Sequence, residues 1–126
     1  MTPQQRELLQ EGIRLFNLGQ FFECHEVLEQ AWLESSGEQK LFLQGLIQIA
    51  VSLHHLRQSN EAGAGRLLAA GMEKLSRLSG ETEAVDISAL LASLEPLRRQ
   101  LHSGQVPQNW PVPQISCKTA TPPPEP

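Results

Sequence analysis

One long apolar stretch, Leu41 to Leu56, constrains the fold more than any other feature of the sequence. An α-helix advances about 100° per residue, and at that spacing the apolar side chains of this stretch cover well over half of the helix circumference. A helix with so broad an apolar surface is buried on most of its sides, so other helices must surround it. The apolar residues are Leu41, Phe42, Leu43, Leu46, Ile47, Ile49, Ala50, Val51, Leu53 and Leu56.

Four other segments carry apolar residues three or four positions apart, which is the pattern of amphipathic helices. The sequence therefore predicts an all-α fold of about five helices, arranged as antiparallel hairpins in a compact bundle. The expected helices cover residues 3–17, 21–34, 38–59, 62–78 and 86–101.

Several residues mark the ends of these helices. Thr2 and Asp86 are expected to cap helix N-termini through their side-chain oxygens, and Gly19 to end the first helix in the left-handed conformation. Pro96 lacks a backbone donor and should kink or split the fifth helix. Residues 79–85 are expected to form a polar loop.

The 126 residues are enough for one domain with its own core. We expect residues 1–104 to form the helical bundle domain and residues 105–126 to form an extended or disordered proline-rich tail, with disorder after Ser116. Four apolar side chains are candidates to anchor the tail on the bundle: Val106, Trp110, Val112 and Ile115.

The charge and hydropathy patterns argue against two classes of partner. Ten basic and fourteen acidic residues give a formal charge of −4, spread without blocks, so we expect no nucleic-acid partner. No apolar run reaches the ~18 residues of a membrane span, so we expect no membrane partner. The N-terminus lacks the features of a secretory signal, which predicts a cytoplasmic location. The broad apolar surface of the third helix leaves both a monomer and a homodimer open.

The candidate functional residues lie where ionisable side chains interrupt apolar helix faces. On a helical wheel, His25 and Glu29 fall inside the apolar sector of the second helix, and Glu26 falls at its edge. His54 falls among apolar residues of the third helix in the same way. A buried carboxylate is costly unless it is paired, and His25 lies one helical turn from Glu29. We therefore expect these two helices to hold a buried polar cluster.

Two interpretations of this cluster rest on its own side chains. In a structural network, Glu29 accepts hydrogen bonds from His25 or His54, and Gln44 or Gln48 satisfies the remaining groups. In a divalent metal site, His25, Glu29 and His54 are the candidate ligands, because helical bundles bind metals with imidazoles and carboxylates from facing helices.

A third interpretation is a small-molecule pocket whose polar residues converge under an apolar wall of Phe22 and Trp32. Catalysis in such a pocket would use His25 as the base, oriented by Glu29. Cys24 is most simply a small core residue, with a reactive thiolate as the alternative. The candidate ligand-binding residues are Phe22, His25, Glu26, Glu29, Trp32, Gln44, Gln48, His54 and His55.

Two known families share motifs with this chain. Gly19-Gln-Phe21-Phe-Glu-Cys24, followed by Leu28, Ala31 and Trp32, resembles the turn and second helix of a tetratricopeptide hairpin. Three further motifs occur over roughly residues 5–80: Phe16-Asn17-x-Gly19-x-Phe21-Phe22-Glu23-x-His25-Glu26-x-Leu28-Glu29-x-x-Trp32, Leu43-Gln44-Gly45-Leu46-Ile47-Gln48 and His54-His55. Together they resemble the domain-of-unknown-function family numbered 309, and this resemblance implies a small all-helical fold without an established activity.

The leading hypothesis for function is a non-catalytic binding or scaffolding module whose partner is an unknown protein or small molecule. The alternative is a small metal- or acid/base-dependent enzyme that uses His25, Glu26, Glu29 and His54. An enzyme requires this cluster to open to a pocket, whereas a structural role requires it to be sealed and fully hydrogen-bonded.

Overall fold

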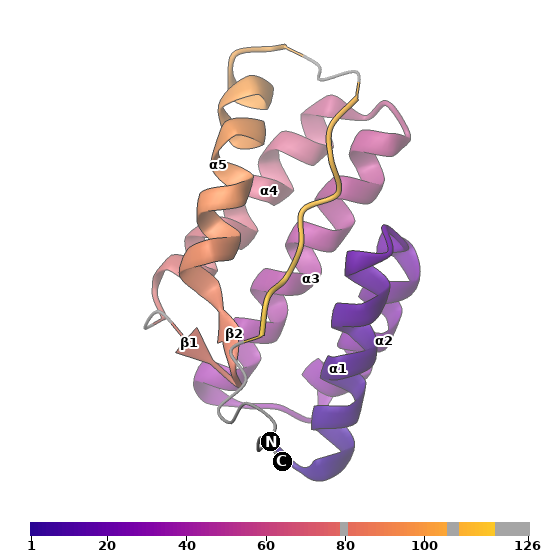
Figure 1. The fold of residues 1–126 in the computed structure, drawn as a ribbon, viewed down its shortest axis with the longest axis vertical. Coiled ribbons are helices and arrows are strands. Elements are labelled where there is room, and N and C mark those ends of the chain that lie inside the picture. Colours follow the sequence, from indigo (N-terminus) through magenta and orange to yellow (C-terminus); the bar gives the residue numbers. More distant parts are fainter. Residues whose placement is uncertain (79–80, 106–108, 118–126) are drawn as a thin grey trace, which may run out of the picture.

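The computed structural model describes residues 1–78, 81–105 and 109–117. Within them the chain forms five helices and one short β-hairpin, so the predicted all-α fold is confirmed (Figure 1). The elements are α1 (Pro3–Asn17), α2 (Phe21–Leu33), α3 (Gly37–Arg57), α4 (Glu61–Ser76), β1 (Glu81–Thr82), β2 (Val85–Asp86) and α5 (Ile87–His102).

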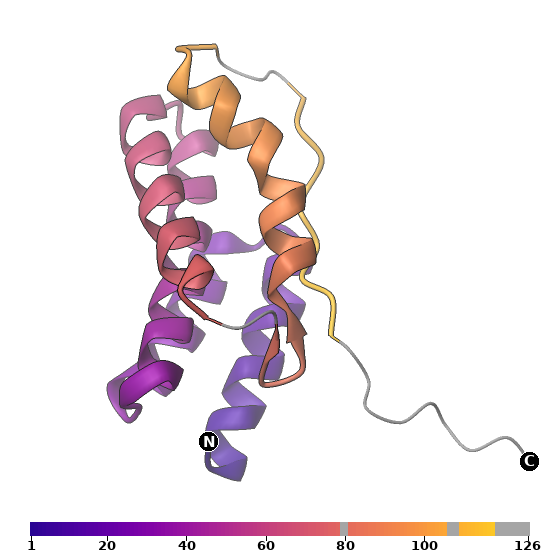
Figure 2. The ribbon, with the colours of Figure 1, turned by 90° about the vertical axis from the view of Figure 1, so that its left-hand side faces the viewer.

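Each helix packs against its neighbours in the chain: α1 on α2, α2 on α3, α3 on α4 and α4 on α5. α3 lies in the middle of the molecule, with α1 and α2 on one side and α4 and α5 on the other (Figure 1). Figure 2 shows α3 and α4 on one side and α5 with the C-terminal segment on the other. The prediction that the third helix is buried on most sides is confirmed, because Phe42, Leu46, Ile49 and Leu53 are almost fully shielded from solvent.

The predicted helix ends are confirmed in atomic detail. Thr2 and Gln5 form a capping box at the start of α1, in which each side chain accepts a hydrogen bond from the other residue's backbone N–H. The Asp86 carboxylate accepts from the backbone N–H of Ala89 at the start of α5. Gly19 follows α1 with a φ of 79°, a conformation that glycine adopts without steric cost.

Part of the loop predicted over residues 79–85 is a β-hairpin, so that prediction is wrong for the described residues 81–85. β1 and β2 pair antiparallel, with Thr82 opposite Val85. Glu83 and Ala84 between them both have positive φ values, as a two-residue hairpin turn requires. Glu-Ala is not one of the Asn-Gly or Asp-Gly pairs that announce such a turn, so the sequence gives no local signal for it.

Pro96 does not split α5, which continues as one helix from Ile87 to His102. Pro96 is exposed to solvent, so water can bond the helix carbonyl that loses its N–H donor.

No helix among the described residues is long and apolar enough to cross a membrane.

α3 and α4 approach each other closely at two glycines. A Cβ atom on Gly71 would lie 2.8 Å from the carbonyl oxygen of Gly45 and 2.8 Å from Cγ1 of Ile49. Only residues without a side chain permit backbones to come so near, so this contact sets the distance between α3 and α4.

Residues 109–117 run in an extended path across α3, between α1 and α5 (Figure 1). Ile115 is buried in the core, and Trp110 and Val112 pack against the core. Three of the four predicted anchors are therefore confirmed. The fourth, Val106, lies outside the described residues, as do residues 118–126 of the stretch 117–126 that was expected to be disordered. The expectation is wrong for Cys117, which forms an antiparallel bridge with Val85.

Candidate functional site

The buried side of α2 is narrower than the sequence predicts. Phe21, Cys24 and Leu28 are at most 2% exposed and face the core. Phe22 is 47% exposed, and the Glu29 side chain is 55% exposed. The prediction that Glu29 lies in a buried sector is therefore wrong. The neighbouring helices α1 and α3 cover one stripe of α2 and leave the edge that carries Phe22 and Glu29 open to solvent.

His25 and Glu29 lie close together without forming a hydrogen bond. The His25 Nε2 atom is 3.6 Å from a Glu29 carboxylate oxygen, which is too long for one. The His25 side chain is 24% exposed, so the pair sits at the surface and water solvates the carboxylate. The predicted buried network around Glu29 is therefore absent from the described residues, and Glu29 needs no protein partner. Glu26, next to His25, is also exposed.

The two histidines that were expected to face each other are both in contact with Phe22. The Phe22 ring centroid lies 5.5 Å from that of His25 and 5.4 Å from that of His54. His54 in turn lies 6.3 Å from His55. We call these four residues, Phe22, His25, His54 and His55, the Phe22 cluster. It joins the first turn of α2 to the last turn of α3 and places an exposed phenyl ring between two imidazoles.

At the opposite end of the same helix pair, Trp32 of α2 carries a cation on its ring. The Lys40 ammonium lies 4.4 Å from the ring centroid of Trp32, a cation–π distance. Lys40 is not among the residues predicted from the sequence. Its contact with Trp32 could have been predicted, because the two residues lie on either side of the short turn between α2 and α3.

Three buried polar side-chain atoms have no hydrogen-bond partner within the described protein, and all three belong to α2 and α3. They are Nδ1 of His25, Nε1 of Trp32 and the side-chain oxygen of Gln48. Buried polar groups in proteins are nearly always paired, either within the protein or with ordered water. Gln44 and His55 are partly buried nearby on α3.

The donor set does not complete a metal site in the described part of the chain. No group of three or more His, Cys, Asp or Glu residues there is placed to bind a metal ion. His25 and Glu29 supply two ligands within reach of each other, and the His25 and His54 rings both contact Phe22.

Cys24 is a core residue. Burial raises the pKa of its thiol to about 12, although a hydrogen bond with the backbone of Phe16 acts in the opposite direction. The thiol therefore stays protonated at neutral pH, and the nucleophilic alternative loses its basis.

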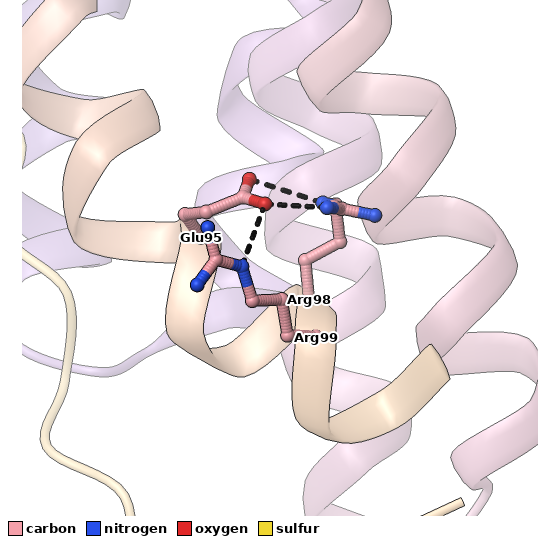
Figure 3. A network of polar contacts seen from close by, with 3 residues as sticks. All are labelled: Glu95, Arg98 and Arg99. Atoms are coloured by element: carbon pink, nitrogen blue, oxygen red, sulfur yellow. Dashed lines mark hydrogen bonds and ion pairs between the residues drawn. The ribbon is translucent and has the colours of Figure 1, made fainter. Parts of the chain in front are cut away.

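Two clefts, of about 370 Å³ and 340 Å³, lie between α4 and α5, share Arg98 and are lined by none of the candidate ligand-binding residues. Glu95 binds the Arg98 guanidinium through both of its oxygens and also accepts a bond of 3.4 Å from Arg99 (Figure 3). Arg98 is therefore already paired with a carboxylate and is not free to attract an anion into the clefts.

Fold and site together define a small all-α protein of sequential antiparallel helices, with its motif residues concentrated on α2 and α3. Residues 9–67 match the sequence model of the family described as "Domain of unknown function (DUF309)". The resemblance seen in the motifs of this chain is therefore confirmed over residues 9–67.

Two curated relatives are similar to this chain. The "Uncharacterized protein YpuF" of Bacillus subtilis (strain 168) is 43% identical over 67 residues, which are 52% of this chain and 37% of YpuF. An "Uncharacterized protein" of Aquifex aeolicus (strain VF5) is 26% identical over 106 residues, which are 83% of this chain and 32% of that protein. The chain thus spans about a third of the length of these relatives.

Proposed function

We propose that this protein is a non-catalytic binding module, and that its partner is another protein that docks on the Phe22 cluster. The observation that carries this proposal is the 47% exposed Phe22 ring held between the imidazoles of His25 and His54. Aromatic side chains that a partner can desolvate contribute most to protein–protein affinity. The imidazoles that contact this ring add hydrogen-bond donors and acceptors.

One unpaired buried atom, Nδ1 of His25, belongs to the Phe22 cluster. Leaving a buried polar group unpaired costs about 1–3 kcal/mol, and such departures from optimal packing concentrate at functional sites.

Catalysis is less well supported by the geometry. His25 and Glu29 are not hydrogen-bonded, and Glu29 is solvated, so it does not orient His25 as a general base requires. In the described residues, His25, Glu29 and His54 are not placed together to bind a divalent metal. We also propose, from the sequence alone, a tetratricopeptide-like arrangement of the α1–α2 hairpin and a cytoplasmic location.

Site-specific photo-crosslinking in cells that express the full chain tests the proposal. A photoreactive phenylalanine analogue placed at position 22 should give a discrete adduct with one protein, identified by mass spectrometry. The same analogue at Ala92, an exposed position on α5, should not give that adduct, and His54→Ala should reduce its yield from position 22. Equal adducts from both positions, or none from position 22, would refute docking at the Phe22 cluster.

A further inference from the structure

The C-terminal segment 109–117 is held on the helices in the way that a peptide ligand is held. Its first anchor is Trp110, whose ring stacks on Phe21 with centroids 6.0 Å apart and an angle of 24° between the ring planes. The Arg57 guanidinium lies 4.6 Å from the Phe21 centroid and 5.6 Å from that of Trp110. Arg57 is itself fixed by a hydrogen bond that it donates to the carbonyl of Gly19. The α1–α2 turn and Arg57 therefore form a binding site for an aromatic side chain.

The second anchor is Asn17, which binds the backbone of the segment. The Asn17 side chain donates to the carbonyl oxygen of Ile115 at 3.1 Å and accepts from the N–H of Ile115 at 2.7 Å. One amide group thus forms both bonds that a neighbouring β-strand would form. The Ile115 side chain is only 3% exposed, so it fills an apolar site beside Asn17.

The third anchor is strand addition at the hairpin. Cys117 forms an antiparallel bridge with Val85, and the N–H of Asp86 donates to the carbonyl of Ser116 at 2.9 Å. Adding an extended peptide to the edge of a sheet is a recurrent way of binding peptides. Between the anchors, Pro111 and Pro113 have no N–H to satisfy, so the segment needs few contacts to stay extended.

We infer that the surface formed by Asn17, Gly19, Phe21 and Arg57 is a docking site for an extended peptide of a partner protein, and that residues 109–117 occupy it in cis. The partner peptide would carry an aromatic residue, prolines, and a branched aliphatic residue five positions after the aromatic one. The four docking residues lie inside the 9–67 stretch that matches the family, whereas the segment lies outside it. This site shares no residue with the Phe22 cluster.

Exposure of the segment supports reversible binding. Asn109, Pro111, Gln114 and Ser116 are exposed, and Ile115 is the one buried member of the described stretch 109–117. A segment held by few buried contacts opens more easily than the core does. A segment that belongs to the same chain as its docking site has an effective concentration of the order of 1 mM. A free peptide with a dissociation constant of about 0.1 mM would therefore bind the wild-type chain about tenfold more weakly than a chain whose own segment is released.

Fluorescence anisotropy with a labelled peptide of residues 109–116, added to the full chain, tests the inference. W110A/I115A, which weakens the cis anchors, should bind the peptide about tenfold more tightly than the wild type does. Adding Asn17→Ala to that variant should abolish binding, and a peptide with its tryptophan and isoleucine replaced by alanine should not bind. Circular dichroism must show that the variants are folded. Absent binding to folded W110A/I115A, or equal binding with and without Asn17→Ala, would overturn the inference.

A second measurement uses the wild-type chain alone, in case the double variant does not fold. Unlabelled peptide at millimolar concentration should speed hydrogen exchange in the chain's own 109–117 segment, because the peptide displaces it, while exchange in α3 and α4 stays unchanged. Exchange that does not respond to the peptide would show that the segment is a fixed part of the fold and would overturn the inference.

Discussion

Two adjacent phenylalanines on α2 provide a direct test of which side chains serve the fold and which serve binding. Phe21 is 2% exposed and belongs to the core, whereas Phe22 is 47% exposed. We predict that Phe21→Ala strongly destabilises the protein and that Phe22→Ala does not. Both changes remove the same atoms from the same helix, so their helix-propensity terms cancel.

The expected magnitudes follow from burial. Removing a fully buried phenylalanine side chain costs about 3–5 kcal/mol, because the transfer free energy is lost and a cavity remains. Complete burial of such a side chain stabilises a protein by about 1.5–3 kcal/mol. Phe22 has about half of its surface buried and leaves no closed cavity when truncated, so Phe22→Ala should cost about 1 kcal/mol.

Urea denaturation followed by far-UV circular dichroism measures both free energies of unfolding. With a slope of about 2 kcal/mol/M, the midpoint should fall by about 2 M for Phe21→Ala and by about 0.5 M for Phe22→Ala. Equal losses of more than about 3 kcal/mol would show that Phe22 is a core residue and would remove the basis for a docking surface there.

Three further predictions concern stability and thiol chemistry. Glu29→Ala should change the free energy of unfolding by less than about 0.5 kcal/mol, since the carboxylate is solvated; a loss of about 2–4 kcal/mol would restore the buried network. In α4, Gly71→Ala should destabilise the protein by about 1–3 kcal/mol, because the added Cβ would press on α3. Gly65→Ala should stabilise it by about 0.5–1 kcal/mol, because the nearest atom to the added Cβ lies at an ordinary contact distance of 3.7 Å. Melting temperatures of the two variants that shift in the same direction would contradict this prediction. A thiol reagent at pH 8 should modify Cys117 and not Cys24 in the folded chain, and both in urea. Because the Cys24 pKa rises from 9.0 to about 12 on folding, the unfolded chain ionises first, so stability should fall between about pH 9 and 12, and fall less in Cys24→Ala.

The fold could be predicted because its determinants are local in the sequence. The apolar breadth of α3, the capping oxygens of Thr2 and Asp86, and the need for glycine at position 19 each act within a few residues, and each is confirmed. The β-hairpin was missed because Glu83 and Ala84 adopt positive φ values that their side chains do not favour. Tertiary contacts, including the strand addition by Cys117, favour that turn.

The site was predicted only in part. A helical wheel gives the angular position of each side chain on its own helix, but not the side chains that surround it in the fold. It assigned His25 and His54 to the apolar sectors of their helices, and both side chains do contact Phe22 where the two helices meet. It did not show how far α1 and α3 wrap around α2, so it assigned Glu29 to the buried side. The docking of Trp110 against Phe21 and Arg57 joins residues far apart in the chain, and neither the spacing nor the composition of the sequence indicates that contact.

The measurement closest to the central claim is the affinity of the crosslinked partner for purified variants, by isothermal titration calorimetry. If the Phe22 cluster is the docking surface, Phe22→Ala should weaken binding at least tenfold, which corresponds to about 1.4 kcal/mol. Leu33→Ala removes another exposed apolar side chain from α2, about 16 Å further along the helix axis, and should change the affinity less than threefold. A partner that binds Phe22→Ala as tightly as it binds the wild type would contradict the account.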